Sequence, residues 1–151
     1  MLQGACIGVV LSLLLLCGCG GAVTPSSSDV VGEWSTKYGA SIHFKEDGTF
    51  EAQALPPSYF SSFMVDDVNR FDGTGIWSLE HLDESERDYR PWEITLNFQV
   101  LSPNVPERFK SFTTNVYVAG SSPMWSPPWQ VVSWEYGDMD GGEMLVFTRK
   151  Q

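Results

Sequence analysis

Cysteine is nearly absent from the chain. The three cysteines are Cys6, Cys17 and Cys19, and residues 20–151 contain none. The body of the protein therefore cannot form an internal disulfide, although exported domains of this size often do. If a leader is removed ahead of Cys19, the mature chain keeps one thiol at its first position. A single thiol in an exported protein is expected to be paired with another chain or chemically modified.

Positive charge is also scarce. The chain has 9 Lys and Arg against 19 Asp and Glu, which gives a formal net charge of −10. A field of this sign repels phosphate backbones, so the composition argues against nucleic acid as a partner. It also disfavours docking on anionic lipid through a basic patch. We interpret the acidity as a means of keeping an exported protein soluble.

No apolar run in the sequence has the length of a membrane-spanning helix. The main run covers residues 5–17 (ACIGVVLSLLLLC), whereas a spanning helix needs about 20 residues. A run of this shorter length fits the hydrophobic region of a signal peptide. Small residues follow at once, and the sequence Leu16-Cys17-Gly18-Cys19 resembles a bacterial lipobox.

The resemblance to lipobox proteins implies a cut between Gly18 and Cys19. It also implies a diacylglyceryl group on the Cys19 sulfur and an acyl group, such as palmitate, on its new amine. The expected organisation is a signal peptide at 1–18, a flexible tether at 19–29 and a folded domain at 30–151. The protein would then lie in the cell envelope, held by lipid on the outer face of the plasma membrane, or of an outer membrane if the organism has one. Plain secretion and an uncleaved anchor helix are the alternatives.

Residues suited to catalysis are few. The sequence has two histidines, His43 and His81, and no G-x-S-x-G nucleophile motif. Residues 137–143 bring three carboxylates into a glycine-rich loop, but the stretch is shorter than the roughly twelve-residue loop of an EF-hand. We therefore expect no catalytic residues, no metal site and no cofactor. A hydrolase built on two carboxylates stays an alternative, because the distance between two such groups is a spatial quantity.

Helical periodicity is nearly absent after residue 30, and short alternating runs bounded by turn residues replace it. Residues 41–45 alternate, with Ile42 and Phe44 on one face. The Asp47-Gly48 turn that follows is the strongest type of short hairpin signal. The sequence therefore predicts a hairpin around this turn.

The same alternation predicts the other strands. It places Ala54 and Val100 on the inward faces of their strands. One helix is predicted over residues 58–68, lying across one mouth of a barrel. The further strands are predicted at 31–35, 49–55, 73–80, 92–100, 109–119, 129–136 and 144–149.

This pattern predicts an all-β fold, an antiparallel meander of about eight strands that closes into a small barrel or folds as a sandwich. Gly32-x-Trp34 in the first strand and Phe147-Thr148-Arg149 in the last resemble the small lipocalin-like domains of bacterial exported proteins. The resemblance implies that Trp34 plugs the closed end of the barrel and that Arg149 packs over it.

Aromatic residues make up 13% of the chain, more than a core of this size requires. We predict that Tyr59, Phe60, Phe63, Trp125 and Trp129 line a ligand site or a barrel mouth, because exposed rings often mark binding surfaces. The expected function is a non-catalytic binding module for an apolar small molecule or an envelope protein. The alternative is a structural or interaction lipoprotein with a filled core and no ligand.

Overall fold

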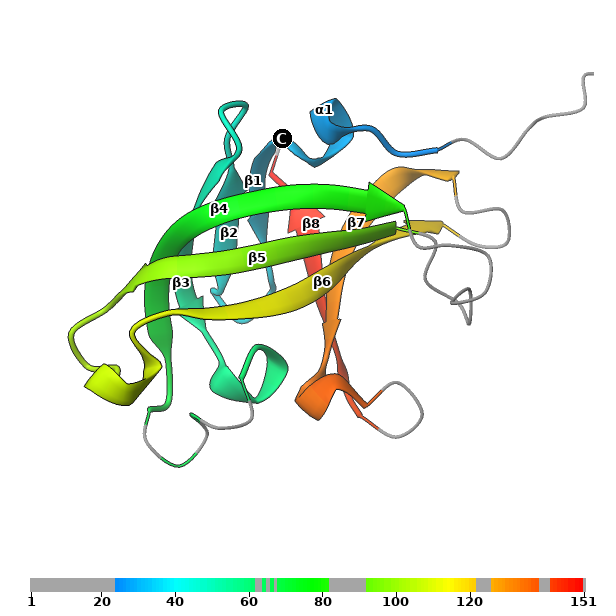
Figure 1. Cartoon of the computed structure of the whole chain (residues 1–151). Helices are drawn as coiled ribbons and strands as arrows, with labels where there is room; N and C mark the ends of the chain where they lie inside the picture. Colours follow the sequence, from blue (N-terminus) through cyan, green and yellow to red (C-terminus); the bar gives the residue numbers. More distant parts are fainter. Residues whose placement is uncertain are drawn as a thin grey trace, which may run out of the picture.

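The computed structural model describes residues 24–61, 64, 66, 68–81, 92–121, 126–138 and 142–150. In this part of the chain, eight antiparallel strands follow one another around a closed barrel, and the last strand pairs with the first (Figure 1). The predicted all-β meander is confirmed, and it closes as a barrel. The strands are β1 (Gly32–Ser35), β2 (Ser41–Phe44), β3 (Thr49–Leu55), β4 (Phe71–His81), β5 (Trp92–Leu101), β6 (Phe112–Ser121), β7 (Ser126–Trp134) and β8 (Met144–Arg149).

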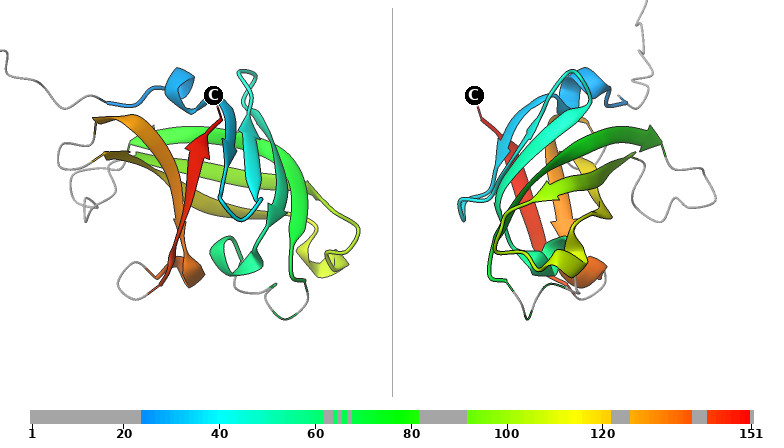
Figure 2. Two further views of the ribbon diagram at one scale, coloured as in Figure 1. Left: turned by 180° about the vertical axis from the view of Figure 1, so that it is seen from behind. Right: turned by 60° about the vertical axis from the view of Figure 1, so that its left-hand side comes forward.

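Short helical turns lie at both ends of the barrel. They include α1 (Ser27–Val30), η1 (Pro57–Tyr59), η4 (Glu107–Phe109) and η5 (Glu135–Gly137). Figures 1 and 2 show α1 at the end that also holds the β2–β3 turn and the C-terminus, and the three η turns at the other end. We call these the α1 end and the η1 end. Among the described residues, no helix has the length and apolarity needed to cross a bilayer.

The predicted β2–β3 hairpin is confirmed. The Lys45 N–H donates to the Thr49 carbonyl at 2.9 Å. The Asp47 carboxylate accepts from the Thr49 N–H at 2.9 Å and from its hydroxyl at 2.6 Å. These two bonds hold the pKa of Asp47 below its ordinary value. Gly48 has a φ of 81°, which glycine adopts without steric cost, so the Asp-Gly sequence explains the tight turn.

The prediction that Val100 points inward is wrong. The β4–β5 ladder pairs Phe98 with Gly75 and Val100 with Thr74, so Gln99 has no partner and forms a bulge. One extra residue turns the following side chains to the opposite face of the sheet. Val100 is therefore 62% exposed.

A second irregularity affects Ala54, for which the inward prediction is also inaccurate. The β3–β4 register shifts before Leu55, which pairs with Phe71 and is fully buried. Ala54 has a φ of 52°, an unusual value for a residue other than glycine, and is only half-buried. Its N–H donates to Oδ1 of Asp72 at 2.7 Å, so a side chain replaces the missing ladder bond.

The helix predicted over residues 58–68 differs in form. The described residues show η1 and a further 3₁₀ position at Met64. The N–H of Phe60 donates to the Pro57 carbonyl at 3.0 Å, a bond across three residues that is typical of the tighter 3₁₀ turn. Phe60, Met64 and Val68 are buried, so the segment closes the η1 end with apolar side chains.

The only α-helix in the described residues, α1, begins in the last residues of the segment predicted to be a flexible tether, 19–29, and ends at the first residue of the predicted domain. The Ser26 N–H and hydroxyl donate to Oδ2 of Asp29 at 2.8 and 2.6 Å. These bonds lower the pKa of Asp29 and stabilise the first turn. Pro25 and Val30 are buried, so the chain is packed on the barrel from residue 25 onward.

Phenylalanine rings fill the middle of the barrel and its η1 end. Neighbouring ring centroids lie 4.6 to 6.3 Å apart, mostly edge to face, which is a favourable geometry for aromatic pairs. Gly73 and Gly75 face the same space and leave room for these rings, because a Cβ on Gly73 would lie 2.6 Å from the ring of Phe98. The rings are those of Phe50, Phe60, Phe71, Phe98, Phe112 and Phe147.

Candidate functional site

Trp34 and Arg149 lie together at the α1 end. They are direct partners in the β1–β8 ladder, and the Arg149 guanidinium carbon lies 5.9 Å from the centroid of the Trp34 ring. Trp34 is 1% exposed, and its Nε1–H donates to the Val30 carbonyl at 2.7 Å. Arg149 also donates to the Val31 carbonyl. The pair therefore ties the first and last strands to the C-terminal end of α1.

Gly32 makes room for this arrangement. Its φ is 135°, a region that residues with a side chain rarely adopt, and a Cβ there would lie 3.0 Å from Nε of Arg149. The glycine two positions before Trp34 thus lets the guanidinium lie against the backbone. One contact, between the Arg149 guanidinium and the Gly32 backbone, therefore explains both the Gly-x-Trp pattern and the arginine in the last strand.

A group of inward-facing side chains at the α1 end remains only half-buried. We call this group the rim: Trp77 and Leu79 on β4, Trp92 on β5 and Trp129 on β7. Each lies on the face of its strand that points into the core further along, where Ile94 and Val131 are fully buried. The rim is therefore where the core reaches solvent at the α1 end, as Leu101, Phe109 and other half-buried side chains do at the η1 end.

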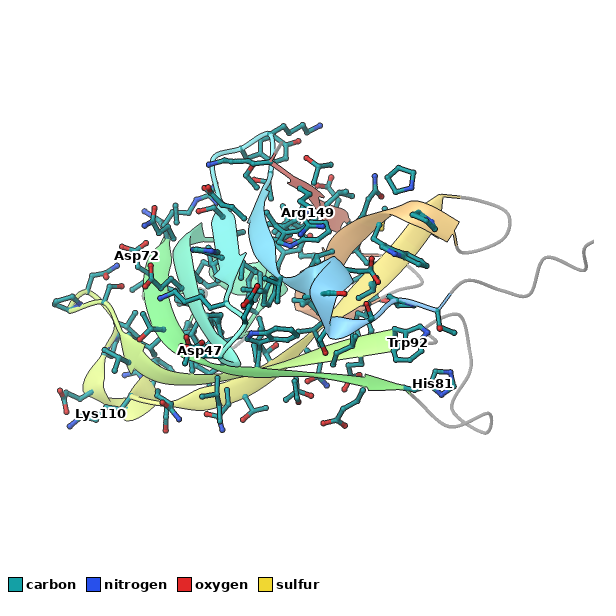
Figure 3. All side chains as sticks on the ribbon, turned by 90° about the horizontal axis from the view of Figure 1, so that it is seen from above. Asp47, Asp72, His81, Trp92, Lys110 and Arg149 are labelled. Carbon is teal, nitrogen blue, oxygen red and sulfur yellow. The ribbon has the colours of Figure 1, made fainter. Side chains whose placement is uncertain are left out.

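Two rim side chains have defined neighbours. Nε1–H of Trp77 donates to the Lys45 carbonyl at 3.1 Å, and its ring lies edge-on to Phe44 at 5.3 Å. Trp92 lies 4.7 Å from the exposed ring of His81, and Figure 3 shows this pair at the outer ends of β4 and β5. The rim is thus held by the hairpin on one side and extends to solvent on the other.

Of the five aromatic residues predicted to line a ligand site or a barrel mouth, the three that the structure describes do not lie together. Tyr59 and Phe60 lie at the η1 end, where Ser133 donates to the Tyr59 carbonyl at 2.6 Å. Phe60 is buried among other rings. Trp129 lies at the α1 end as part of the rim. The remaining two, Phe63 and Trp125, lie outside the described residues, as do Gly18 and Cys19 of the lipobox.

The chain was compared with known families, curated proteins and solved structures. None of the three comparisons found a match. The function is therefore inferred from the residues and geometry of this chain.

Among the described residues, the side chains suited to metal binding or acid–base chemistry do not gather in one place. Within the part of the chain that the structure describes, no three His, Cys, Asp or Glu side chains are placed to hold a metal ion. His43 is exposed on the outer face of β2, and His81 packs on Trp92. Lys45 pairs with Glu51 by a salt bridge, which lowers the pKa of that carboxyl.

A surface hollow of about 620 Å³ lies at the η1 end. Residues 99–107 and Lys110, all from one short stretch of the chain, form its walls. The exposed Lys110 is paired there with Glu107. This hollow is open to solvent and separate from the rim, so we do not assign the binding surface to it.

Sequence reasoning did not place Trp77, Leu79 and Trp92 at a site. Alternation along β4 and β5 correctly indicates that they face inward. It does not indicate that both strands continue past the filled part of the barrel. The available signal was the length of the runs predicted at 73–80 and 92–100, 8 and 9 residues, compared with 5 residues each at 31–35 and 41–45.

We expect Tyr59 to make the domain sensitive to alkaline pH. Burial raises the pKa of its phenol above the ordinary value of 10.0, and the carboxylates of Glu135 and Glu143 add to the shift. Because the folded state disfavours the phenolate, stability should be complete below the unfolded pKa and fall as the pH rises through the folded pKa. Tyr59→Phe should lose less unfolding free energy than wild type between pH 8 and about pH 11, measured by urea titration.

Tyr38→Phe is the matched control for this experiment, since Tyr38 is 65% exposed. Because Tyr38 is the last and smallest of the causes that raise the pKa of Tyr59, this variant should keep most of the wild-type pH dependence. The prediction would be contradicted if wild type and Tyr59→Phe lost equal unfolding free energy as the pH rose over the alkaline range of the experiment.

Proposed function

We propose that this chain is an exported, lipid-anchored and non-catalytic binding module, and that its binding surface for apolar groups is the rim. The lipobox-like sequence ending at Cys19 supports the anchor. The half-buried indoles at the α1 end support the binding surface. The rim is the observation on which the proposal depends, because a surface that converges apolar side chains beside solvent is typical of ligand sites.

The lipocalin-like resemblance supports part of this proposal. The closed eight-stranded barrel and the Trp34–Arg149 pair fit the resemblance. In that family the tryptophan plugs the closed end, which leaves the opposite end for the ligand. Here Phe60 and Met64 occupy the opposite end, so we place binding at the rim instead of in a deep cavity.

The test uses the uncharged probe N-phenyl-1-naphthylamine and the leaderless chain, whose closed core lies within the described residues. We expect energy transfer from tryptophan to the bound probe. Trp92→Ala and Trp129→Ala should each weaken binding by about tenfold, because each removes a half-buried indole from the contact. Trp134→Ala should leave binding unchanged, since Trp134 lies on the outer face of β7, 5.5 Å from the ring of Tyr117.

A variant at the η1 end, Phe60→Ala, supplies a second comparison for probe binding. If Phe60→Ala changed probe affinity and the rim variants did not, the ligand would lie in the η1 end and the rim proposal would be wrong. Stability of each variant is followed by thermal unfolding, so that loss of fold is not read as loss of binding.

A second function, an interaction lipoprotein without a small ligand, is favoured by the rings that fill the centre of the barrel. Phe44, Phe50, Leu96 and Phe98 are all at most 1% exposed. Absence of probe binding together with an unchanged melting temperature would support this function over the first.

A further inference from the structure

The packed part of the chain begins very near the proposed lipid. Thr24 is the first described residue, and it leads into α1 at the α1 end of the barrel (Figure 1). Five residue steps separate it from Cys19. Fully extended, five steps span at most about 18 Å. If Cys19 carries acyl chains inserted in a bilayer, the α1 end must therefore stay close to the headgroups.

The rim lies at this same end of the molecule. Figure 3 shows His81 and Trp92 at the ends of their strands, on the side where the described chain begins before α1, and Figures 1 and 2 show these ends of β4 and β5 on the same side. The η1 end is farther away, because the ten residues of β5 extend about 30 Å along the strand and run from the α1 end toward the η1 end. The five residue steps from Cys19 to Thr24 are too short for the η1 end to reach the same bilayer unless the α1 end turns away from it.

The chemistry of the rim fits a membrane interface. Indole rings concentrate at the headgroup level of membranes, where the apolar ring and the N–H group are both accommodated. Three of the four rim side chains are tryptophans, and none of the four carries a charge. The rim therefore matches the interfacial layer better than it matches a polar protein surface.

The charge of the chain indicates which lipid surface suits it. The net charge is −10, and two lysines at the α1 end, Lys45 and Lys150, are paired with Glu51 and Glu33. Such pairing leaves little attraction for anionic headgroups, whose binding relies on clusters of Lys and Arg. A zwitterionic surface carries no net charge, so it does not repel the acidic domain.

We infer that the α1 end of the barrel rests on the zwitterionic bilayer surface that holds the Cys19 lipid, with the rim side chains in the interfacial layer. This inference rests on the proposed lipid anchor and names the apolar partner of the rim. It also sets the orientation of the domain, with η4, η5 and the surface hollow directed away from the membrane.

The test uses the full processed lipoprotein in phosphatidylcholine vesicles. His81→Cys and Lys110→Cys each give the mature chain one free thiol. Lipidation blocks the Cys19 sulfur, and cleavage of the leader removes Cys6 and Cys17. Each variant is labelled with a nitrobenzoxadiazole dye, and lipids with a nitroxide near the headgroup are added as quenchers. The dye at position 81 should be quenched several-fold more strongly than the dye at position 110, and iodide in the water should give the reverse order.

A second variant separates rim contact from simple tethering. Adding Trp92→Ala and Trp129→Ala to His81→Cys should lower the lipid quenching at position 81, if the rim holds the domain on the surface. Unchanged quenching would show that the tether alone sets the position. Replacing phosphatidylcholine with phosphatidylglycerol should also weaken the quenching, because the acidic domain is repelled, and stronger quenching would contradict the inference.

The outcomes distinguish the two proposals. A processed chain without acyl mass, or one that does not float with vesicles, would overturn the proposed anchor. An anchored chain with equal quenching at positions 81 and 110 would overturn the orientation and leave the anchor intact. Probe binding at the rim of the leaderless chain together with equal quenching would identify a soluble apolar molecule as the partner instead.

Discussion

Replacing Cys19 with Ala is expected to abolish stable membrane attachment. Without the thiol no diacylglyceryl group can be added, so the protein should appear in the soluble fraction or remain as an unprocessed precursor. The effect should be nearly all-or-none, since a single acyl chain binds membranes only marginally, whereas two or more hold a protein stably. Fractionation and intact mass of the wild type and the variant measure both outcomes.

Cys17→Ala is the matched control, because this cysteine lies two residues earlier, within the expected signal peptide. It should leave the mature mass and the membrane fraction unchanged. The lipid model would be wrong if Cys19→Ala gave a cleaved chain that fractionated like wild type. It would also be wrong if the mature wild-type chain carried no added acyl mass.

Gly75→Ala is expected to destabilise the barrel severely. A Cβ on Gly75 would lie 1.9 Å from the carbonyl oxygen of Asn97 and 3.0 Å from the ring of Phe50. The first contact is with backbone, so relief requires β4 and β5 to separate beside the bulge at Gln99. Overpacking costs about 1–3 kcal/mol in most cores and occasionally more, and we expect the upper end of this range.

A loss of about 3 kcal/mol should lower the melting temperature by about 10 °C in a domain of this size. Thermal unfolding followed by circular dichroism measures the change. Thr74→Ala, on the exposed face of the same strand, should shift the melting temperature by only about a degree or two. A Gly75→Ala chain that melts with wild type would show that the two strands adjust more freely than their contacts indicate.

Local pattern was sufficient for much of the fold. The predicted strands 49–55 and 144–149 match β3 and β8, and the Asp47-Gly48 turn lies where it was expected. Alternation predicts a strand because its side chains point to opposite faces with a period of two residues. Turn chemistry predicts a hairpin because the required backbone angles suit few residues.

The candidate site could be predicted from the sequence less well than the strands. Trp129 was expected at a barrel mouth, yet the rim also contains Trp77, Leu79 and Trp92, which come from two other strands. Tyr59 and Phe60, which were also expected at a ligand site or barrel mouth, lie at the opposite end from Trp129. Which end a side chain reaches depends on the position of each strand along the barrel axis, and alternation along one strand carries no such information.

The residues by themselves determine local features: the alternation of buried and exposed positions, the hairpin turn and the lipobox-like pattern that ends at Cys19. Three other features depend on distant parts of the chain meeting in space. The bulge at Gln99 turns Val100 outward, β8 closes on β1 through Trp34 and Arg149, and α1 packs where a tether was expected. Each arises because backbone hydrogen bonds and apolar surface must be satisfied by partners far away in sequence, and only the closed barrel supplies those partners.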